Sequence, residues 1–172
     1  MNPSTPRHPA ALDPETLLGQ CTITRSRASG PGGQHRNKVE TAIRITHRPT
    51  GVSASASERR SQAENQRVAV FRLRVNLALE VRQGVEAGRE PSPLWRSRCS
   101  GGRIAVNPRH ADFPAVLAEA LDVLAACKWE PDRAGDWLGC TTSQMVKLLK
   151  RDPAALVMVN QHRAAKGKHA LK

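Results

Sequence analysis

The chain contains a run of three glycines around one proline, Gly30-Pro31-Gly32-Gly33, followed by Gln34. Such a backbone can take positive φ and approach a ligand closely, while the proline ring limits how far it wanders. The run lacks the Gly-Lys-Ser/Thr of a P-loop and the strand–GxGxxG–helix layout of a dinucleotide fold. It therefore predicts a loop that presents one neutral amide between cationic neighbours, and not a phosphate site of either type.

The net charge indicates a polyanionic partner. The 172 residues include 27 Lys and Arg against 15 Asp and Glu, a formal charge of +12, with a pI of about 10.8. Such a surface attracts polyanions and speeds encounter with them, so we expect nucleic acid and, among large assemblies, the ribosome. Aromatic residues make up only 3% and tyrosine is absent, which argues against single-strand binding by base stacking.

Cysteine spacing indicates neither a metal site nor a disulfide framework. Cys21, Cys99, Cys127 and Cys140 form no Cys-x-x-Cys pair, so we expect reduced, mostly packed thiols, no metal and no other cofactor. No stretch reaches the ~18 consecutive apolar residues of a membrane helix, and the N-terminus lacks the apolar core of a signal peptide. We expect a soluble, monomeric, cytoplasmic protein.

Periodicity predicts a small sheet followed by a long helix. Alternating residues predict three strands, at 21–26, 41–47 and 52–55. Cys21 and Ile23 are expected to point inward, and 49–51 to form a hairpin turn. The segment 58–83, free of proline and glycine, predicts a helix. Its expected buried stripe is Val68, Phe71, Val75 and Leu79.

Composition divides the chain into five parts. We expect a disordered N-terminus at 1–11, an α+β domain at 12–84, a linker at 85–110, a helical domain at 111–165 and a basic tail at 166–172. Trp95 is expected to anchor the linker. Asp112 is expected to cap the first helix of the helical domain. The expected apolar face of this helix is Val116, Leu117, Leu121 and Leu124.

Residues 134–149 resemble a helix-turn-helix, with an apolar helix, a glycine turn at Gly139 and a second helix from Thr142. On this interpretation Lys147 and Lys150 lie on exposed positions that can bind RNA. The other interpretation is an ordinary helical hairpin packed on Leu121, Leu124 and Trp129. The sequence leaves both open.

Several blocks between residues 22 and 79 resemble the catalytic domain of bacterial-type peptide chain release factors. The blocks are residues 29–34, 37–41 and 46–51, and Arg60-Ser61-Gln62 followed by Asn65. They occur in the family's order. The resemblance implies an α+β fold with a short sheet, a long helix and a protruding Gly-Gly-Gln loop, followed here by the small helical domain.

The resemblance also implies a chemistry, hydrolysis of the ester that joins peptide to tRNA. In the family the main-chain N–H of the glutamine is the catalytic group, and ribosomal RNA forms the rest of the site. This assigns Gln34 as the catalytic residue, with Gly32 and Gly33 allowing close approach. Family members are often methylated on this amide, so Gln34 is also a candidate modification site. The expected RNA contacts of the domain are Arg25, Arg27, His35, Arg36, Lys38 and Arg60.

The likeness begins near residue 22, which leaves no room before it for a domain that reads a stop codon. The chain therefore resembles the codon-independent hydrolases that rescue stalled ribosomes or large subunits, with the ribosome and peptidyl-tRNA as partners. The alternatives are a non-catalytic ribosome- or RNA-binding factor and a DNA-binding regulator using the helix-turn-helix. The basic tail is either a solvated terminus or a segment for the empty mRNA channel, as in rescue hydrolases.

Overall fold

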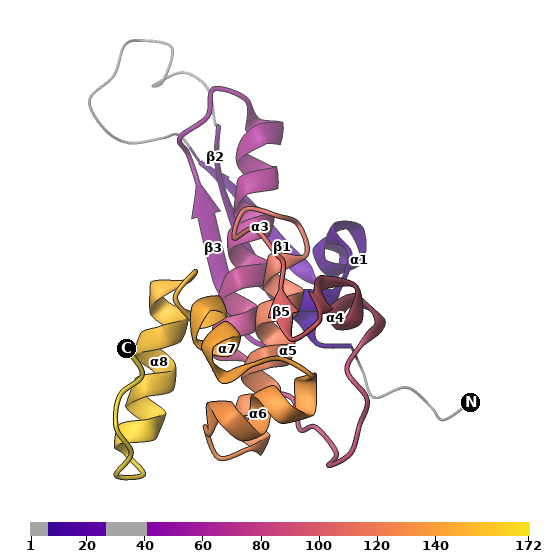
Figure 1. The fold of residues 1–172 in the computed structure, drawn as a ribbon. Coiled ribbons are helices and arrows are strands. Elements are labelled where there is room, and N and C mark those ends of the chain that lie inside the picture. The colour runs from indigo at the N-terminus through magenta and orange to yellow at the C-terminus, as the bar shows by residue number, and fades with distance from the viewer. Residues whose placement is uncertain (1–6, 27–40) are drawn as a thin grey trace. The chain divides into compact units, whose positions relative to one another are not determined.

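The computed structural model describes residues 7–26 and 41–172, and the chain divides into two compact units, Met1–Glu80 and Val81–Lys172 (Figure 1). The first unit combines a three-stranded sheet with a long helix. The second unit is mainly helical, with one short hairpin. This mixture confirms the expected α+β class.

The first unit is built on an antiparallel sheet with the strand order β1-β2-β3. Its strands are β1 (Cys21–Ser26), β2 (Ala42–His47) and β3 (Ser53–Ala56). In the turn from β2 to β3, the N–H of Gly51 donates to the carbonyl oxygen of His47 over 2.8 Å. Gly51 has a φ of 73°, which glycine adopts without strain. The structure confirms the three predicted strands and the hairpin turn.

Helix α3 (Gln62–Glu80) packs against β2 and β3. Its buried apolar face follows Ala69, Leu73 and Leu77 at helical spacing, with Val70 and Ala78 beside them. The predicted stripe is wrong, because its members are only half-buried: Val68, Phe71, Val75 and Leu79. Apolar residues lie on several sides of this helix, so periodicity alone could not identify the face that the sheet covers.

Helix α3 is also shorter at both ends than the predicted 58–83. At its start, the Ser61 hydroxyl accepts a hydrogen bond from the N–H of Glu64 over 3.4 Å. Beyond Glu80, the N–H of Gln83 donates to the Asp122 carboxylate over 3.0 Å. The backbone at Gln83 is therefore paired with a side chain instead of continuing the helix.

Strand β1 lies at one edge of the sheet. Ile23 pairs with Ile45 and shares its face, yet Ile23 is 37% exposed while Ile45 is fully buried. The expected burial of Ile23 is therefore wrong, because α3 lies over β2 and β3 and the edge strand is less covered. Cys21, at the other end of β1, is buried as predicted.

Two short helices precede the sheet, η1 (Pro9–Ala11) and α1 (Pro14–Gly19). Asp13 caps α1, since its carboxylate accepts from the N–H of Thr16 over 2.9 Å. The expectation of disorder as far as residue 11 is wrong at η1. There Ala10 is fully buried and its carbonyl oxygen accepts from Nε of the buried Arg74 over 2.9 Å. Residues 1–6 lie outside the described part of the chain.

The second unit contains five helices and a short hairpin: α4 (Pro93–Arg98), β4 (Cys99–Ser100), β5 (Arg103–Ile104), α5 (Phe113–Ala126), α6 (Pro131–Leu138), α7 (Thr142–Leu149) and α8 (Pro153–Ala164). The segment 85–110, expected as a linker, contains α4 and the hairpin. Trp95 anchors it, as predicted: the ring is buried and its N–H donates to the Leu138 carbonyl oxygen over 2.7 Å. Among the described residues, no helix is both long and apolar enough to cross a membrane.

Helix α5 forms the buried centre of the second unit. Its predicted apolar face is confirmed, since these four side chains are fully buried: Val116, Leu117, Leu121 and Leu124. Asp112 precedes the helix as expected, but its side chain does not cap it. The carboxylate instead forms an ion pair with Arg98, with 2.6 Å between the nearest nitrogen and oxygen.

The C-terminal tail folds back on the helical unit. The Lys168 ammonium pairs with Glu130 and donates to the carbonyl oxygen of Lys128 over 3.0 Å. Leu171 and Asn160 are joined by two hydrogen bonds. The N–H of Leu171 donates to the Asn160 side-chain oxygen over 2.8 Å, and the Asn160 side-chain nitrogen donates to the Leu171 carbonyl oxygen over 3.1 Å. The backbone of this tail is thus held against α8, while three of its basic side chains stay exposed: Lys166, His169 and Lys172.

Candidate functional site

The candidate site is the loop between β1 and β2, and the structure describes the two strands that carry it. Ser26 pairs with Ala42 at the last position of the ladder, so the chain leaves and re-enters the sheet at one end. The predicted catalytic residues lie outside the described residues: Gly32, Gly33 and Gln34. So do four predicted RNA contacts: Arg27, His35, Arg36 and Lys38. What the structure defines is the frame of this loop.

Asn65, fully buried near the start of α3, binds the chain on the C-terminal side of the loop. Its side-chain nitrogen donates to the carbonyl oxygens of Thr41 over 2.7 Å and Arg59 over 2.9 Å. Its side-chain oxygen accepts from the N–H of Arg59 over 2.9 Å. One amide therefore joins the residue before β2, the β3–α3 connection and α3. Removing it would leave several polar groups without partners.

Arg72 adds a second link between α3 and the end of β3. Its guanidinium donates to the carbonyl oxygen of Ser55 over 2.9 Å and pairs with Glu58. Hydrogen bonds from backbone N–H groups, that of Ser57 first, and then the Arg72 guanidinium hold the pKa of Glu58 below its usual value. Glu58 is therefore ionised near neutral pH, and it neutralises one of the cations at this end of the unit.

The far end of β2 is held by His47, which is 2% exposed. Its Nδ1 lies 2.8 Å from the Thr50 hydroxyl oxygen and its Nε2 lies 3.0 Å from the Gln20 side-chain oxygen. Because the Gln20 oxygen can only accept, Nε2 carries the proton and Nδ1 accepts from the hydroxyl. Burial, and then the nearby Arg48 charge, lower the pKa of His47. The ring is therefore neutral near pH 7.

Four predicted RNA contacts lie within the described residues, and all four are exposed. Arg25 lies on β1 next to the last pair of the ladder, and Arg60 lies in the β3–α3 connection. Both belong to the end of the first unit from which the loop leaves, where Figure 1 shows the start of β2 and the start of α3 together. Lys147 and Lys150 belong to the second unit, in α7 and directly after it.

The thiols and acidic groups offer no second chemistry in the described part of the chain. No group of three or more His, Cys, Asp or Glu there could hold a metal ion. The cysteines are free, and three are buried while Cys99 is half-buried. Burial raises the pKa of the Cys21 thiol, and burial followed by the neighbouring Cys99 raises that of Cys140 to about 12. Such thiols are protonated and unreactive near neutral pH.

Sequence reasoning places Asn65 in a motif without indicating what it does. A signal was nevertheless present, since Asn65, Ala69 and Leu73 follow each other at four-residue spacing on the buried face of α3. A polar side chain in a buried stripe needs hydrogen-bond partners. The hydrogen-bond partner, the Thr41 carbonyl oxygen, is 24 positions away, so local sequence patterns could not have identified it.

Comparison with known proteins places the same region in one family. Residues 17–102, half of the 172, match the RF-1 domain. The chain is 51% identical over 78 residues to peptide chain release factor 1 of Acidiphilium cryptum, covering 45% of this chain and 22% of the relative. It is 55% identical over 92 residues to peptide chain release factor 1 of Malacoplasma penetrans, covering 54% and 25%.

A differently named relative matches a shorter stretch. The chain is 50% identical over 56 residues to peptide chain release factor 2 of Staphylococcus haemolyticus, covering 33% of this chain and 15% of the relative. The chain thus spans about a quarter or less of the length of these three relatives. The likeness concerns one domain of larger proteins, and it includes the loop between β1 and β2.

Proposed function

The chain belongs to the RF-1 domain family, and on this premise we propose that it hydrolyses the ester bond of peptidyl-tRNA on the ribosome. The observation that carries the proposal is the intact Gly32-Gly33-Gln34 run between two paired strands of the matched domain. The matching relatives are named peptide chain release factors. Ribosomal RNA and peptidyl-tRNA are then the partners.

In this reaction, water attacks the carbonyl carbon of the ester. The bond from that carbon to the ribose oxygen of the tRNA breaks, which leaves a peptide carboxyl group and a tRNA hydroxyl. The Gln34 amide does not titrate near neutral pH, so it is not a general base. We assign its main-chain N–H to the charge that develops on the carbonyl oxygen, and its side chain to ordering the site. Methylation of the side-chain amide, which we also propose, would leave this N–H available.

The described frame supports this assignment. The Ser26–Ala42 pair and the Asn65 hydrogen bonds fix the positions where the loop leaves and rejoins the sheet. Fixed ends reduce the conformational freedom that must be lost when the loop meets its substrate. Around it, cationic and imidazole side chains would bind phosphates of ribosomal RNA, in keeping with the formal charge of +12. They are Arg25, Arg27, His35, Arg36, Lys38 and Arg60.

We further propose that release does not depend on a stop codon. The family match ends at residue 102, whereas the helical unit runs from Val81 to Lys172. Most of this folded unit therefore lies beyond the matched domain. It offers a means of engaging a stalled ribosome or a separated large subunit that needs no codon. The protein would work as a monomer in the cytoplasm.

The test of codon independence is release of labelled peptide from ribosomes that hold peptidyl-tRNA in the P site. The A site would contain no mRNA, a sense codon or a stop codon in three parallel reactions. Wild-type protein is expected to release peptide without a stop codon. A strict requirement for a stop codon would refute codon independence while leaving the hydrolysis proposal intact.

The test of hydrolysis is the Gly33→Ala variant in the same assay. The added Cβ should restrict the backbone approach and abolish release, while ribosome binding persists because the charge is unchanged. Gly19→Ala is the matched control, since its Cβ would meet nothing within 4 Å. Full release by Gly33→Ala, or none by wild type on ribosomes or large subunits, would overturn the proposal. Binding without release would then favour a ribosome-binding factor.

A further inference from the structure

Helices α6 and α7 are joined as a tight helix-turn-helix. Gly139 begins the turn with a φ of 68°, and the Thr141 hydroxyl caps α7 by accepting from the N–H of Gln144 over 3.2 Å. Gly135 of α6 lies against the turn: its carbonyl oxygen accepts from the N–H of Cys140 over 2.9 Å. A Cβ on Gly135 would stand 2.7 Å from the Cys140 carbonyl oxygen. This approach holds the second helix close to the first.

Helix α7 has one buried and one exposed face. Met145, Leu148 and Leu149 are at most 1% exposed, and α7 packs on α5 and α6. Two residues on the opposite face, Ser143 and Lys147, are exposed, and Lys150 continues the same i, i+4, i+7 series directly after the helix.

Two further cations adjoin this face. Arg151 follows Lys150 and is exposed. Arg103 of β5 is also exposed. It lies beside the start of α7, because both of its neighbours bond there. The Gly102 carbonyl oxygen accepts from the N–H of Thr141 over 3.2 Å, and the N–H of Ile104 donates to the side-chain oxygen of Gln144 over 3.3 Å. The α7 surface is defined as Arg103, Ser143, Lys147, Lys150 and Arg151.

Within the described residues, the cations of the α7 surface form no ion pair. No acidic residue occurs from 137 to 151, and the carboxylate of Asp152, which follows Arg151, accepts hydrogen bonds from the N–H groups of Ala154 and Ala155. Other cations of the same unit are paired: Arg82, Arg96, Arg98, Arg163 and Lys168.

We propose that the α7 surface binds the phosphate backbone of double-helical RNA. The proposal rests on the proposed function, which brings the protein to ribosomal RNA. Single strands are bound largely by stacking on exposed aromatic rings. In residues 81–172 the Trp and Phe rings are all buried or half-buried: Trp95, Phe113, Trp129 and Trp137. RNA helices are instead recognised by shape, through phosphates and 2′-hydroxyls, which Lys, Arg and Ser side chains can bind.

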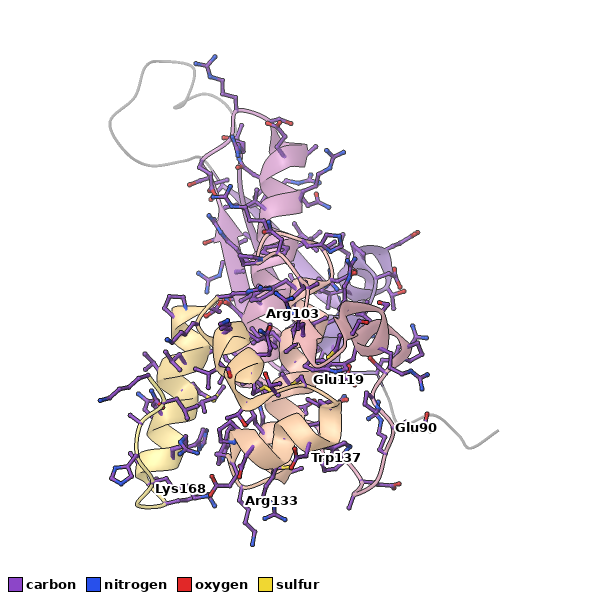
Figure 2. All side chains as sticks on the ribbon, in the orientation of Figure 1. Glu90, Arg103, Glu119, Arg133, Trp137 and Lys168 are labelled. Atoms are coloured by element: carbon purple, nitrogen blue, oxygen red, sulfur yellow. The ribbon has the colours of Figure 1, made fainter. Side chains whose placement is uncertain are left out.

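The experiment measures binding of the full chain to a fluorescent RNA hairpin with a stem of about 20 base pairs, long enough for a protein that spans successive grooves. Dissociation constants are measured over a series of salt concentrations for wild type and for Lys147→Gln/Lys150→Gln. The matched control is Arg109→Gln/Arg133→Gln, which removes the same charge at exposed positions outside the α7 surface. Figure 2 shows Arg133 at the opposite end of the helical unit from Arg103.

Loss of Lys147 and Lys150 is expected to weaken RNA binding and to reduce the slope of log K against log salt by about 2, one per phosphate contact. The control should change neither value appreciably. Equal loss in both double variants would overturn the proposal, because it would reflect net charge alone. Tighter binding to a DNA duplex of the same sequence would also overturn it. Since the assay contains no peptidyl-tRNA, a failure of the hydrolysis proposal would not alter its outcome.

Discussion

The side-chain amide of Asn65 and the carbonyl oxygen of Thr41 are joined by a 2.7 Å hydrogen bond that spans 24 positions of the sequence. Thr41 is the residue from which the chain enters β2 after the glycine loop, and Asn65 is fully buried in α3. The same side chain makes two further bonds to the backbone of Arg59. The long helix of the first unit therefore fixes where the loop ends.

We expect Asn65→Ala to destabilise the first unit by about 2–4 kcal/mol, since three backbone groups would lose their buried partner. Urea unfolding measures this change. At a temperature where the variant is folded, peptide release should slow more than ribosome binding weakens, because the loop would be held less firmly. Asn76→Ala is the control on the same helix: it removes one bond, of 2.9 Å to the Ser53 carbonyl oxygen, away from the loop. Equal effects of both variants on release would contradict a positioning role for Asn65.

Elements whose signals are local could be predicted from the sequence. The turn between α6 and α7 lies at the predicted Gly139 and α7 begins at the predicted Thr142, because a glycine ends one helix and Thr141 caps the next. The alternation of β1 and β2 was equally local. The motif around Gln34 identified the candidate site, although the loop that carries Gln34 lies outside the described residues.

Features that depend on distant partners could not be predicted. Arg74 is buried because the Ala10 carbonyl oxygen, 64 positions away, accepts from its Nε. Asp112 stands where a helix cap belongs, yet it pairs with Arg98 instead. In each case a polar side chain is committed to a partner that only the tertiary fold supplies. Polar side chains on expected surfaces are thus the hardest positions to assign from the sequence.

A second prediction concerns Asp122, which bonds to the Arg82 guanidinium and the Gln83 N–H. Burial raises the pKa of its carboxyl from 3.8 to about 6. Between these values the folded protein holds a proton that the unfolded chain releases, so this group lowers the free energy of unfolding as pH rises from 4 to 6, by about 2–3 kcal/mol. Asp122→Asn keeps an acceptor but cannot titrate. Urea unfolding from pH 4 to 7 should give wild-type and variant stabilities that converge at low pH, and parallel curves would contradict the prediction.

His47 should produce the opposite dependence in the first unit. Its pKa is lowered by burial and then by Arg48, so on acidification the unfolded chain takes up a proton before the folded one does. The free energy of unfolding should therefore fall as pH drops below the ordinary histidine value of about 6.5. His47→Gln removes the titration and should flatten this part of the pH profile, which hydrogen exchange of the β2–β3 amides would resolve. If His47→Gln kept the wild-type slope of the free energy of unfolding against pH, His47 would not be the cause of this pH dependence.

The last prediction concerns the close approach at Gly135. A Cβ there would stand 2.7 Å from the carbonyl oxygen of Cys140, a backbone atom that cannot rotate away. Gly135→Ala should therefore push α7 from α6 and destabilise the second unit by about 1–3 kcal/mol. Gly84→Ala, whose Cβ would meet nothing within 4 Å, is the matched control and should leave stability unchanged or slightly raised. Thermal unfolding compares the two, and RNA binding by Gly135→Ala should weaken with the α7 surface displaced. If Gly135→Ala were as stable as Gly84→Ala, the close approach at Gly135 would not be what holds the α7 surface in place.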